Sequence, residues 1–296
     1  GDRNIDNREV MDIWRAMAAG IKKGDGGKHL MSYHPAGEQS SSQYKEDWID
    51  FNMFQSGHAN KYMPVYRFAE TDYNSIPVKP FLDAEPAYED IPVKFWEYIQ
   101  WDSTQKVPDS VLNKDNTIRK PQYFKEGFFT DYDVRVHAYW NFLSGACGYT
   151  YGNNAVWQMF KRNQNFTIPC LTDWKEALKQ PGAKDMIHVR NFFETVPFHK
   201  LRPDQSIIKS KYAKDSTYIC AATTADQSIA VVYLAKGQKV SLSLERFKNK
   251  RVSATWYNPR NGKFSKPILT KSVERFTFTP PTSKKKDDWL IVLKEY

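Results

Sequence analysis

The chain has 296 residues with 41% hydrophobic and 15% aromatic content, which is enough to bury a large core and excludes an intrinsically disordered protein. The length suggests two domains, and no apolar run approaches the ~20 residues of a membrane-spanning helix. The net charge of +9 would suit nucleic acid, but the basic residues are scattered, so no nucleic-acid partner is expected. The densest basic run, Lys284 to Lys286, is followed at once by Asp287 and Asp288, which predicts a solvated turn. A basic surface suits an acidic polysaccharide equally well.

Residues 1–200 alternate short apolar runs that end in polar clusters with longer amphipathic stretches, which is the pattern of repeating β/α units. Apolar residues from Val10 to Ile21 recur at helical spacing and predict a helix over 8–22. The predicted strands cover 29–35, 48–53, 78–83 and 145–152. The further predicted helices cover 62–73, 130–142, 174–178 and 183–194. Three tryptophans lie at helical spacing and are expected to pack in the interior: Trp14, Trp96 and Trp140.

From residue 201 to 296 the pattern changes to short β-rich runs separated by turn signals, which predicts an antiparallel β-sandwich domain. The runs cover 218–222, 228–234, 240–244, 251–257 and 289–293. Their alternation is typical of a sheet with one buried and one solvated face. Because this domain has no catalytic constellation, its expected role is structural support. The three cysteines show no paired spacing, so we expect buried free thiols at Cys147, Cys170 and Cys220 rather than a metal site or disulfides.

The strand count of the first domain fits part of a (β/α)8 TIM barrel. With a strand that would end at Gly1 and Asp2, the segment has five strand ends, which predicts an α/β fold comprising about strands 4–8 of the barrel. Half a parallel barrel would expose strand edges and apolar faces. The missing N-terminal half is therefore expected in a separate segment or beyond the printed sequence.

Two acidic motifs lie at predicted strand ends, Asp2 near the start of the chain and Glu85 after the strand over 78–83. Glycoside hydrolysis needs two carboxyl groups, one to protonate the leaving oxygen and one to attack the sugar or activate water. A separation of ~5 Å between them would indicate retention of configuration. Two neighbouring acids are weaker candidates: Asp83 is expected to cap a turn, and Glu89 to orient Glu85 or an arginine.

Several motifs together resemble the apiosidase-like glycoside hydrolases, which are (β/α)8 barrels followed by a small β-sandwich that carries a collagen-binding label. The resemblance covers the whole chain and rests on residues 1–4, 32–35, 50–58, 83–89, 145–152, 256–262 and 288–293. It implies a retaining O-glycosyl hydrolase with Asp2 as acid/base at the fourth strand end and Glu85 as nucleophile at the seventh. It also implies polysaccharide or oligosaccharide substrates, with apiose-containing pectic side chains as the narrower expectation, and no cofactor.

Polar and aromatic side chains at the same strand ends are candidates for sugar binding. Hydrogen bonds to the sugar are expected from Asn4, His34, Gln55, Ser56, His58 and Glu89. Tyr151 and Trp157 are expected to form a wall on which a sugar ring stacks. A metal site is not expected, because His29 and His34 lie five residues apart on one predicted strand and would point to opposite faces.

Two other functions remain open. The barrel end could serve as the binding surface of a non-catalytic carbohydrate-binding or adhesive protein, and a nucleic-acid binder would show steeply salt-dependent retention on duplex DNA. For a hydrolase that acts on polysaccharide, we expect a secreted, periplasmic or cell-surface location.

Overall fold

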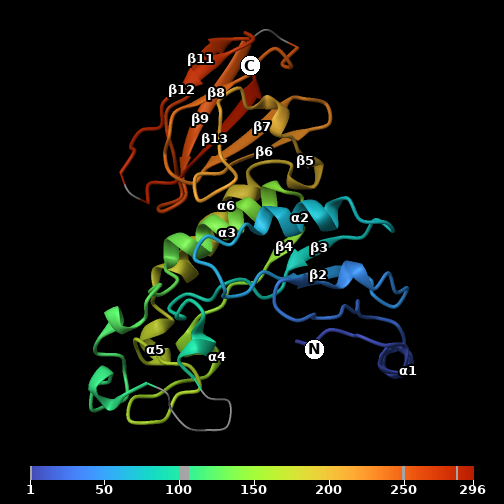
Figure 1. Cartoon of the computed structure of the whole chain (residues 1–296). Helices are drawn as coiled ribbons and strands as arrows, with labels where there is room; N and C mark the ends of the chain where they lie inside the picture. The colour runs from blue at the N-terminus through green and yellow to red at the C-terminus, as the bar shows by residue number, and fades with distance from the viewer. Residues whose placement is uncertain (1, 100–106, 249–250, 285) are drawn as a thin grey trace.

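The computed structural model describes residues 2–99, 107–248, 251–284 and 286–296. Gly1 and Lys285, which belong to two of the sequence motifs above, lie outside these ranges. A small mainly parallel sheet and its helices form the first part of the molecule, and an antiparallel sandwich lies on the far side of helices α3 and α6 (Figure 1). This confirms a mixed α/β fold with a C-terminal β-sandwich. No helix in the described ranges is long and apolar enough to cross a membrane.

The first helix confirms its prediction and extends it by three residues, because α1 covers Arg8–Asp25. Its start is capped by Asn7, whose side chain accepts a hydrogen bond from the Val10 backbone N–H, and it ends at Gly26, whose φ is 67°. Trp14 packs edge-on against Tyr33 at 4.9 Å between ring centroids. The apolar stripe that predicted the helix is exposed at Val10, Ile13, Met17 and Ile21.

Four short strands form the sheet of the first part in the order β1-β2-β3-β4. They are β1 (Gln39–Ser40), β2 (Asn52–Gln55), β3 (Phe81–Asp83) and β4 (Gly148–Tyr149). The pairs β2–β3 and β3–β4 are parallel, and β1, which the sequence did not predict, pairs antiparallel with β2. The carboxyl ends of the three parallel strands therefore share one edge of the sheet.

The predicted strand over 29–35 is wrong, since the structure forms no strand there. One hydrogen bond of the expected strand pairing goes to a side chain instead, because the Met31 backbone N–H donates to Asp50 Oδ2 at 2.8 Å. The Ser32 hydroxyl donates to the Phe51 carbonyl oxygen at 2.5 Å. These bonds still fix the segment beside β2.

The remaining helices confirm the predicted ones within a few residues, except for the unpredicted short helix α4. They are α2 (Val65–Tyr73), α3 (Asp131–Leu143), α4 (Asn154–Trp157), α5 (Trp174–Ala177) and α6 (Pro181–Glu194). Helix α3 is unusual because eleven of its thirteen residues are buried. A helix that is buried all round must have packing partners on every side.

The sandwich confirms all five predicted strands and adds four. Its strands are β5 (Leu201–Pro203), β6 (Ile219–Thr224), β7 (Ile229–Leu234), β8 (Val240–Leu242), β9 (Arg251–Asn258), β10 (Lys263–Phe264), β11 (Ile268–Lys271), β12 (Phe276–Phe278) and β13 (Trp289–Glu295). The large sheet has the order β10-β9-β13-β7-β6-β5 with β11 also paired to β9, and β12 pairs with β8.

The prediction that this sheet has one solvated face is wrong for its central strands. On β7, Val232 and Leu234 belong to the interior cluster of the sandwich, whereas Val231 and Tyr233 belong to a second cluster shared with α3 and α6. Both faces of β7 are therefore buried. The sandwich and the first part share one apolar cluster, in addition to the cluster inside the sandwich and those inside the first part.

The predicted solvated turn forms at Lys284 and Lys286, which are exposed, and the Asp287 backbone N–H donates to the Lys284 carbonyl oxygen at 2.9 Å. The prediction is wrong for Asp288, which belongs to a buried ion pair between the sandwich and the first part. Arg135 of α3 donates two hydrogen bonds of 2.9 Å to the carboxylate of Asp288, which is 0% exposed. Asp185 of α6 also pairs with Arg135, and the Tyr233 hydroxyl donates to Asp288 at 2.8 Å. Asp288 is thus shielded from water and compensated by charge.

Two further predictions about single residues are wrong. Cys147 is exposed, although Cys170 and Cys220 are buried free thiols as expected. Trp96 is 42% exposed, whereas Trp140 is buried in the cluster around α3.

Glu89, in the loop after β3, is buried and joins three segments of the first part. Its carboxylate accepts from the Tyr151 hydroxyl at 2.5 Å and from the Gly182 backbone N–H in the first turn of α6 at 3.1 Å. Its backbone N–H donates to the Gly152 carbonyl oxygen at 2.9 Å. Burial raises the pKa of Glu89 to about 7, although both hydrogen bonds lower it.

Replacing Arg135 by Met should destabilise the whole chain by about 3 to 5 kcal/mol, because the buried Asp185 would lose its ion-pair partner and the ion pair left to Asp288 would be its 3.4 Å contact with Arg260. The matched control is Arg190→Met on the exposed face of α6, where Arg190 pairs with Glu194 and the loss should stay below about 1 kcal/mol. Urea denaturation at neutral pH measures both. Equal losses in the two variants would contradict the role given to Arg135.

Glu89→Gln should show a pH-dependent effect on stability. Because the folded-state pKa of Glu89 is raised to about 7, its contribution is full below the ordinary glutamate value and is lost as the pH rises through about 7. The stability advantage of the parent over the variant should therefore shrink between pH 5 and pH 8, as measured from urea midpoints. A difference between the parent and Glu89→Gln that stays constant over this range would refute the raised pKa.

Candidate functional site

Asp2, His34 and Glu85 come together at the edge where the parallel strands end. His34 Nε2 lies 3.2 Å from Glu85 Oε2, and one oxygen or nitrogen of each of the three side chains lies within 4.8 Å of the others. The Asp2 backbone N–H donates to the His34 carbonyl oxygen at 2.8 Å, which ties the start of the chain to the segment before β1. Two predicted carboxyls and one predicted histidine thus form one cluster.

The position of Glu85 is fixed by the ends of β2 and β3. The Gly57 backbone N–H, just after β2, donates to the Glu85 carbonyl oxygen at 3.0 Å. Gly57 has a φ of 70°, a conformation that side chains rarely adopt. Asp83, at the end of β3, is fully buried and accepts from the Ser56 hydroxyl at 2.6 Å and from its backbone N–H. Burial raises the pKa of Asp83 to about 7. Ser56 is therefore hydrogen-bonded inside the protein, and its bonds to Asp83 link the end of β2 to the end of β3.

The two carboxyls of the cluster have pKa values shifted in opposite directions. Asp2 is exposed as a residue, but desolvation of its carboxyl and the charge of Glu85 raise its pKa. Burial alone would raise the pKa of Glu85, yet the hydrogen bond from His34 and the nearby imidazoles bring it below the ordinary value. Reciprocally, the hydrogen bond to Glu85 raises the pKa of His34. Both shifts act in the direction that favours a proton on Asp2 and a charge on Glu85.

Gln55 and His58, both predicted to bind sugar, are buried at the end of β2. Each has one polar side-chain atom without a hydrogen-bond partner among the described residues. Gln55 hydrogen-bonds Asp2, while its Oε1 has no partner among the described residues. His58 is 5% exposed, and burial lowers its pKa to about 4, so the ring is neutral near pH 7. Within the described part of the chain its Nε2 also lacks a partner. Unpaired buried polar atoms are costly, and a hydroxyl-rich ligand would satisfy them.

Four other residues that were predicted to bind sugar lie in surroundings different from those of Gln55 and His58. Asn4 is exposed. The Tyr151 hydroxyl is directed to the buried Glu89. Trp157 of α4 is 47% exposed, and its indole N–H donates to Asn154 Oδ1 at 3.3 Å. These contacts give Glu89 an internal role and leave Trp157 as an accessible aromatic surface.

The sequence missed Tyr88 as a partner of the acid pair, placing it only among aromatic residues near strand ends. Its ring lies edge-on to His58 at 4.7 Å between centroids, and burial together with the charge of Glu85 raises its pKa. The only available signal was its position three residues after Glu85 in the same motif.

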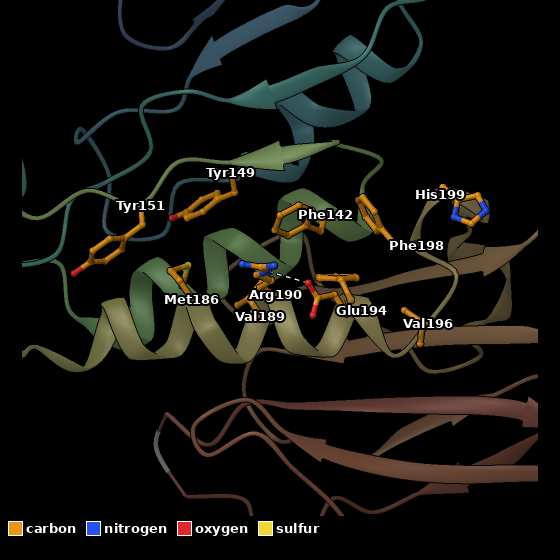
Figure 2. A pocket seen from close by; sticks show the side chains of 11 residues that line it. Phe142, Tyr149, Tyr151, Met186, Val189, Arg190, Glu194, Val196, Phe198 and His199 are labelled. Carbon is orange, nitrogen blue, oxygen red and sulfur yellow. Dashed lines mark hydrogen bonds and ion pairs between the residues drawn. The ribbon is translucent and has the colours of Figure 1, made fainter.

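A cavity of about 520 Å³ lies elsewhere, between β4 and α6 (Figure 2). Its lining is mostly apolar and includes Tyr149, Met186, Val189 and Phe193, with Tyr151 at one side. Asp2, His34 and Glu85 are not among its lining residues. A polyhydroxylated ligand would find few hydrogen-bond partners in this apolar lining.

A divalent cation could also be accommodated by three donors at the spacing of Asp2, His34 and Glu85. Two of these donor atoms, His34 Nε2 and Glu85 Oε2, already contact each other directly without a cation.

The comparisons with known proteins agree with this architecture. The model of the family described as "Apiosidase-like, catalytic domain" matches residues 1–200, and that described as "Putative collagen-binding domain of a collagenase" matches residues 202–294. No curated protein is similar enough to match the chain.

Two solved structures are similar over the entire chain. One is a glycoside hydrolase and the other a glycoside hydrolase of family 5 from Bacteroides vulgatus; each has 27% sequence identity and a TM-score of 0.83 over 100% of this chain. The chain spans only 63% and 61% of the lengths of these two structures. Since the family match covers residues 1–200, the chain belongs to the apiosidase-like catalytic-domain family.

Proposed function

We propose that this protein hydrolyses glycosidic bonds in a polysaccharide or oligosaccharide with Asp2 as the acid/base and Glu85 as the nucleophile. The observation that carries the proposal is the closeness of these two carboxyls, within 4.8 Å, combined with their opposite pKa shifts. A pair of acids whose environments separate their pKa values is the usual basis for dividing acid and nucleophile roles.

The geometry supports a retaining reaction, because retaining glycosidases hold their carboxyls about 5 to 5.5 Å apart and inverting ones hold them wider. In the first step, protonated Asp2 gives its proton to the leaving oxygen while the Glu85 carboxylate attacks the anomeric carbon. In the second, the Asp2 carboxylate removes a proton from water, and the resulting hydroxide displaces Glu85 from the sugar. The proton returns to Asp2, and Glu85 leaves as a carboxylate.

The residues around the pair support sugar binding. Gln55 Oε1 and His58 Nε2 offer unsatisfied buried atoms to sugar hydroxyls, and His34 holds Glu85. Among polysaccharide side chains, the family match favours apiose-containing pectic ones. We assign no substrate contact to Glu89 or Ser56, whose polar atoms bond within the protein.

We extend the proposal to the domain architecture of the chain and to the cellular location of the protein. The parallel strands β2, β3 and β4 would be consecutive strands of a (β/α)8 barrel in a catalytic domain of residues 1–200, with a supporting sandwich of residues 201–296. An enzyme that acts on polysaccharide would work outside the cytoplasm, as a secreted, periplasmic or cell-surface protein.

Asp2→Asn and Glu85→Gln should each lower sugar release from pectic oligosaccharides by at least about 100-fold, because each removes one of the two acids that the reaction needs. Glu9→Gln, an exposed carboxylate at the start of α1, is the matched control and should keep the parental rate. Parental rates in both site variants would overturn the assignment. Binding of the oligosaccharides without release by any protein would instead favour a carbohydrate-binding function.

The pH dependence of kcat/KM should be bell-shaped. Activity requires ionised Glu85, whose pKa is lowered, and protonated Asp2, whose pKa is raised, so the acid limb follows Glu85 and the alkaline limb follows Asp2. Initial rates between pH 3 and 9 measure the two limbs. A rate that keeps rising above pH 8 is incompatible with Asp2 as the acid.

A further inference from the structure

His34 has an acceptor atom opposite each of its two ring nitrogens. Its Nε2 lies 3.2 Å from Glu85 Oε2, and its Nδ1 lies 3.0 Å from the Pro35 carbonyl oxygen. A carbonyl oxygen can only accept a hydrogen bond, so Nδ1 carries a proton in this contact. An ionised Glu85 also only accepts, so Nε2 carries a second proton. The surroundings of the ring therefore match an imidazolium cation, which donates from both nitrogens.

The backbone on both sides of His34 is held in place. The Asp2 backbone N–H donates to the His34 carbonyl oxygen at 2.8 Å. The preceding residue, Tyr33, is 3% exposed, and its hydroxyl donates to the Arg3 carbonyl oxygen at 2.7 Å. The Tyr33 ring also packs edge-on against three other aromatic rings. The imidazole thus reaches Glu85 from an anchored segment, which is what a residue that orients a reactive group requires.

A second contact between a histidine and a carboxylate in the same part of the chain differs in its burial. His29 Nδ1 also lies 3.2 Å from Asp25 Oδ2, but the His29 side chain is 81% exposed. The side chains of His34 and Glu85 are only 26% and 23% exposed. Water screens the exposed contact much more than the half-buried one. The charge of His34 therefore acts on Glu85 with little screening.

The charges around the pair agree with a cationic His34. The interaction with Glu85 raises the pKa of His34, burial opposes this rise, and the charge of Asp2 adds to it. Burial alone would raise the pKa of Glu85, but the imidazole of His34 helps to bring it below its ordinary value. Three further titratable groups interact with Glu85: Asp83, His58 and Tyr88. None of these three is positively charged at pH 7, since His58 has a pKa of about 4.

We propose that His34 is a positioning residue for the nucleophile, and that it acts as an imidazolium ion which fixes the Glu85 carboxylate and keeps it ionised. The inference rests on the proposed function, in which Glu85 attacks the anomeric carbon. Because Nδ1 faces Pro35 and Nε2 faces Glu85, we assign no sugar hydroxyl to the His34 ring. Charge-assisted contacts of this kind are stronger than those between neutral groups.

Two substitutions of His34 test this role. His34→Leu removes both nitrogens, so kcat for sugar release from pectic oligosaccharides should fall roughly 10- to 100-fold with KM little changed. In His34→Gln, the amide N–H can donate to Glu85 from nearly the position of Nε2, so this variant should keep roughly 5- to 10-fold more activity than His34→Leu. All assays contain EDTA, because the same donors could hold a cation.

His29→Gln is the matched control, because it removes an imidazole at the same 3.2 Å from a carboxylate but in an exposed position. It should keep the parental kcat and KM. A parental kcat in His34→Leu, or equal activity in the two His34 variants, overturns the inference. A rise of KM at unchanged kcat in His34→Leu would assign the ring to sugar binding and overturns it as well.

Nitrogen-15 NMR of protein labelled at the imidazole rings tests the ion pair without any activity. The chain has six histidines, and the resonances of His34 are identified by their loss in His34→Gln. At a fixed neutral pH, the fraction of His34 that is protonated on both nitrogens should be larger in the parent than in Glu85→Gln. The neutral fraction should carry its proton on Nδ1, which faces the Pro35 carbonyl oxygen.

Equal protonated fractions in the parent and Glu85→Gln, or a neutral ring protonated on Nε2, contradict the inference. The proposed function fails separately, if Asp2→Asn and Glu85→Gln both release sugar at the parental rate. In that case the NMR measurement still decides whether His34 is the cation beside Glu85.

Discussion

Burial of helix α3 on all sides is the constraint on which the rest of the structure depends. One side of α3 faces the small parallel sheet, and the other faces the large sheet of the sandwich (Figure 1). Apolar packing alone would let α3 slide between two such surfaces, because the hydrophobic effect has no direction. Directional contacts fix it: Arg135 pairs with Asp288, and the Trp140 indole N–H donates to the Tyr218 carbonyl oxygen at 3.1 Å.

The same helix sets the position of the strand end beside the acid pair. The Asn141 amide donates to the Gly148 carbonyl oxygen, and the Tyr149 hydroxyl donates to the Val134 carbonyl oxygen, so β4 is held against α3. Strand β4 pairs with β3, and the loop after β3 carries Glu85. The candidate site is thus attached to rigid elements through its own strands, while its donors come from loops, as is common where a scaffold positions reactive groups.

Much of this arrangement could be predicted from local sequence pattern. Helical spacing gave α1, α2 and α3, and the clusters at strand ends gave Asp2, His34 and Glu85 as one site. The errors have physical causes. Asp288 looked solvated because its partner Arg135 is 153 residues away, and local composition does not show a charge pair at that distance. The buried second face of β7 was visible in the unbroken apolar run from Ala230 to Leu234, which a half-solvated strand would not have. The placement of Tyr88 was missed because its ring packs against Gly152 and His58, which are remote from it in the sequence.

Burial of the large sheet on both faces limits how the sandwich can be separated from this chain and joined to other proteins. A sandwich with one solvated face could be transferred between proteins as an independent module. This one presents Val231, Tyr233 and Val292 on the face that α3 and α6 cover, and Asp288 accepts two hydrogen bonds from Arg135, which lies outside the sandwich, in addition to its contact with Arg260 inside it. Any new host would have to supply both an apolar helix surface and a correctly placed arginine. The sandwich and its helices are therefore constrained to be inherited, and to vary, as a unit.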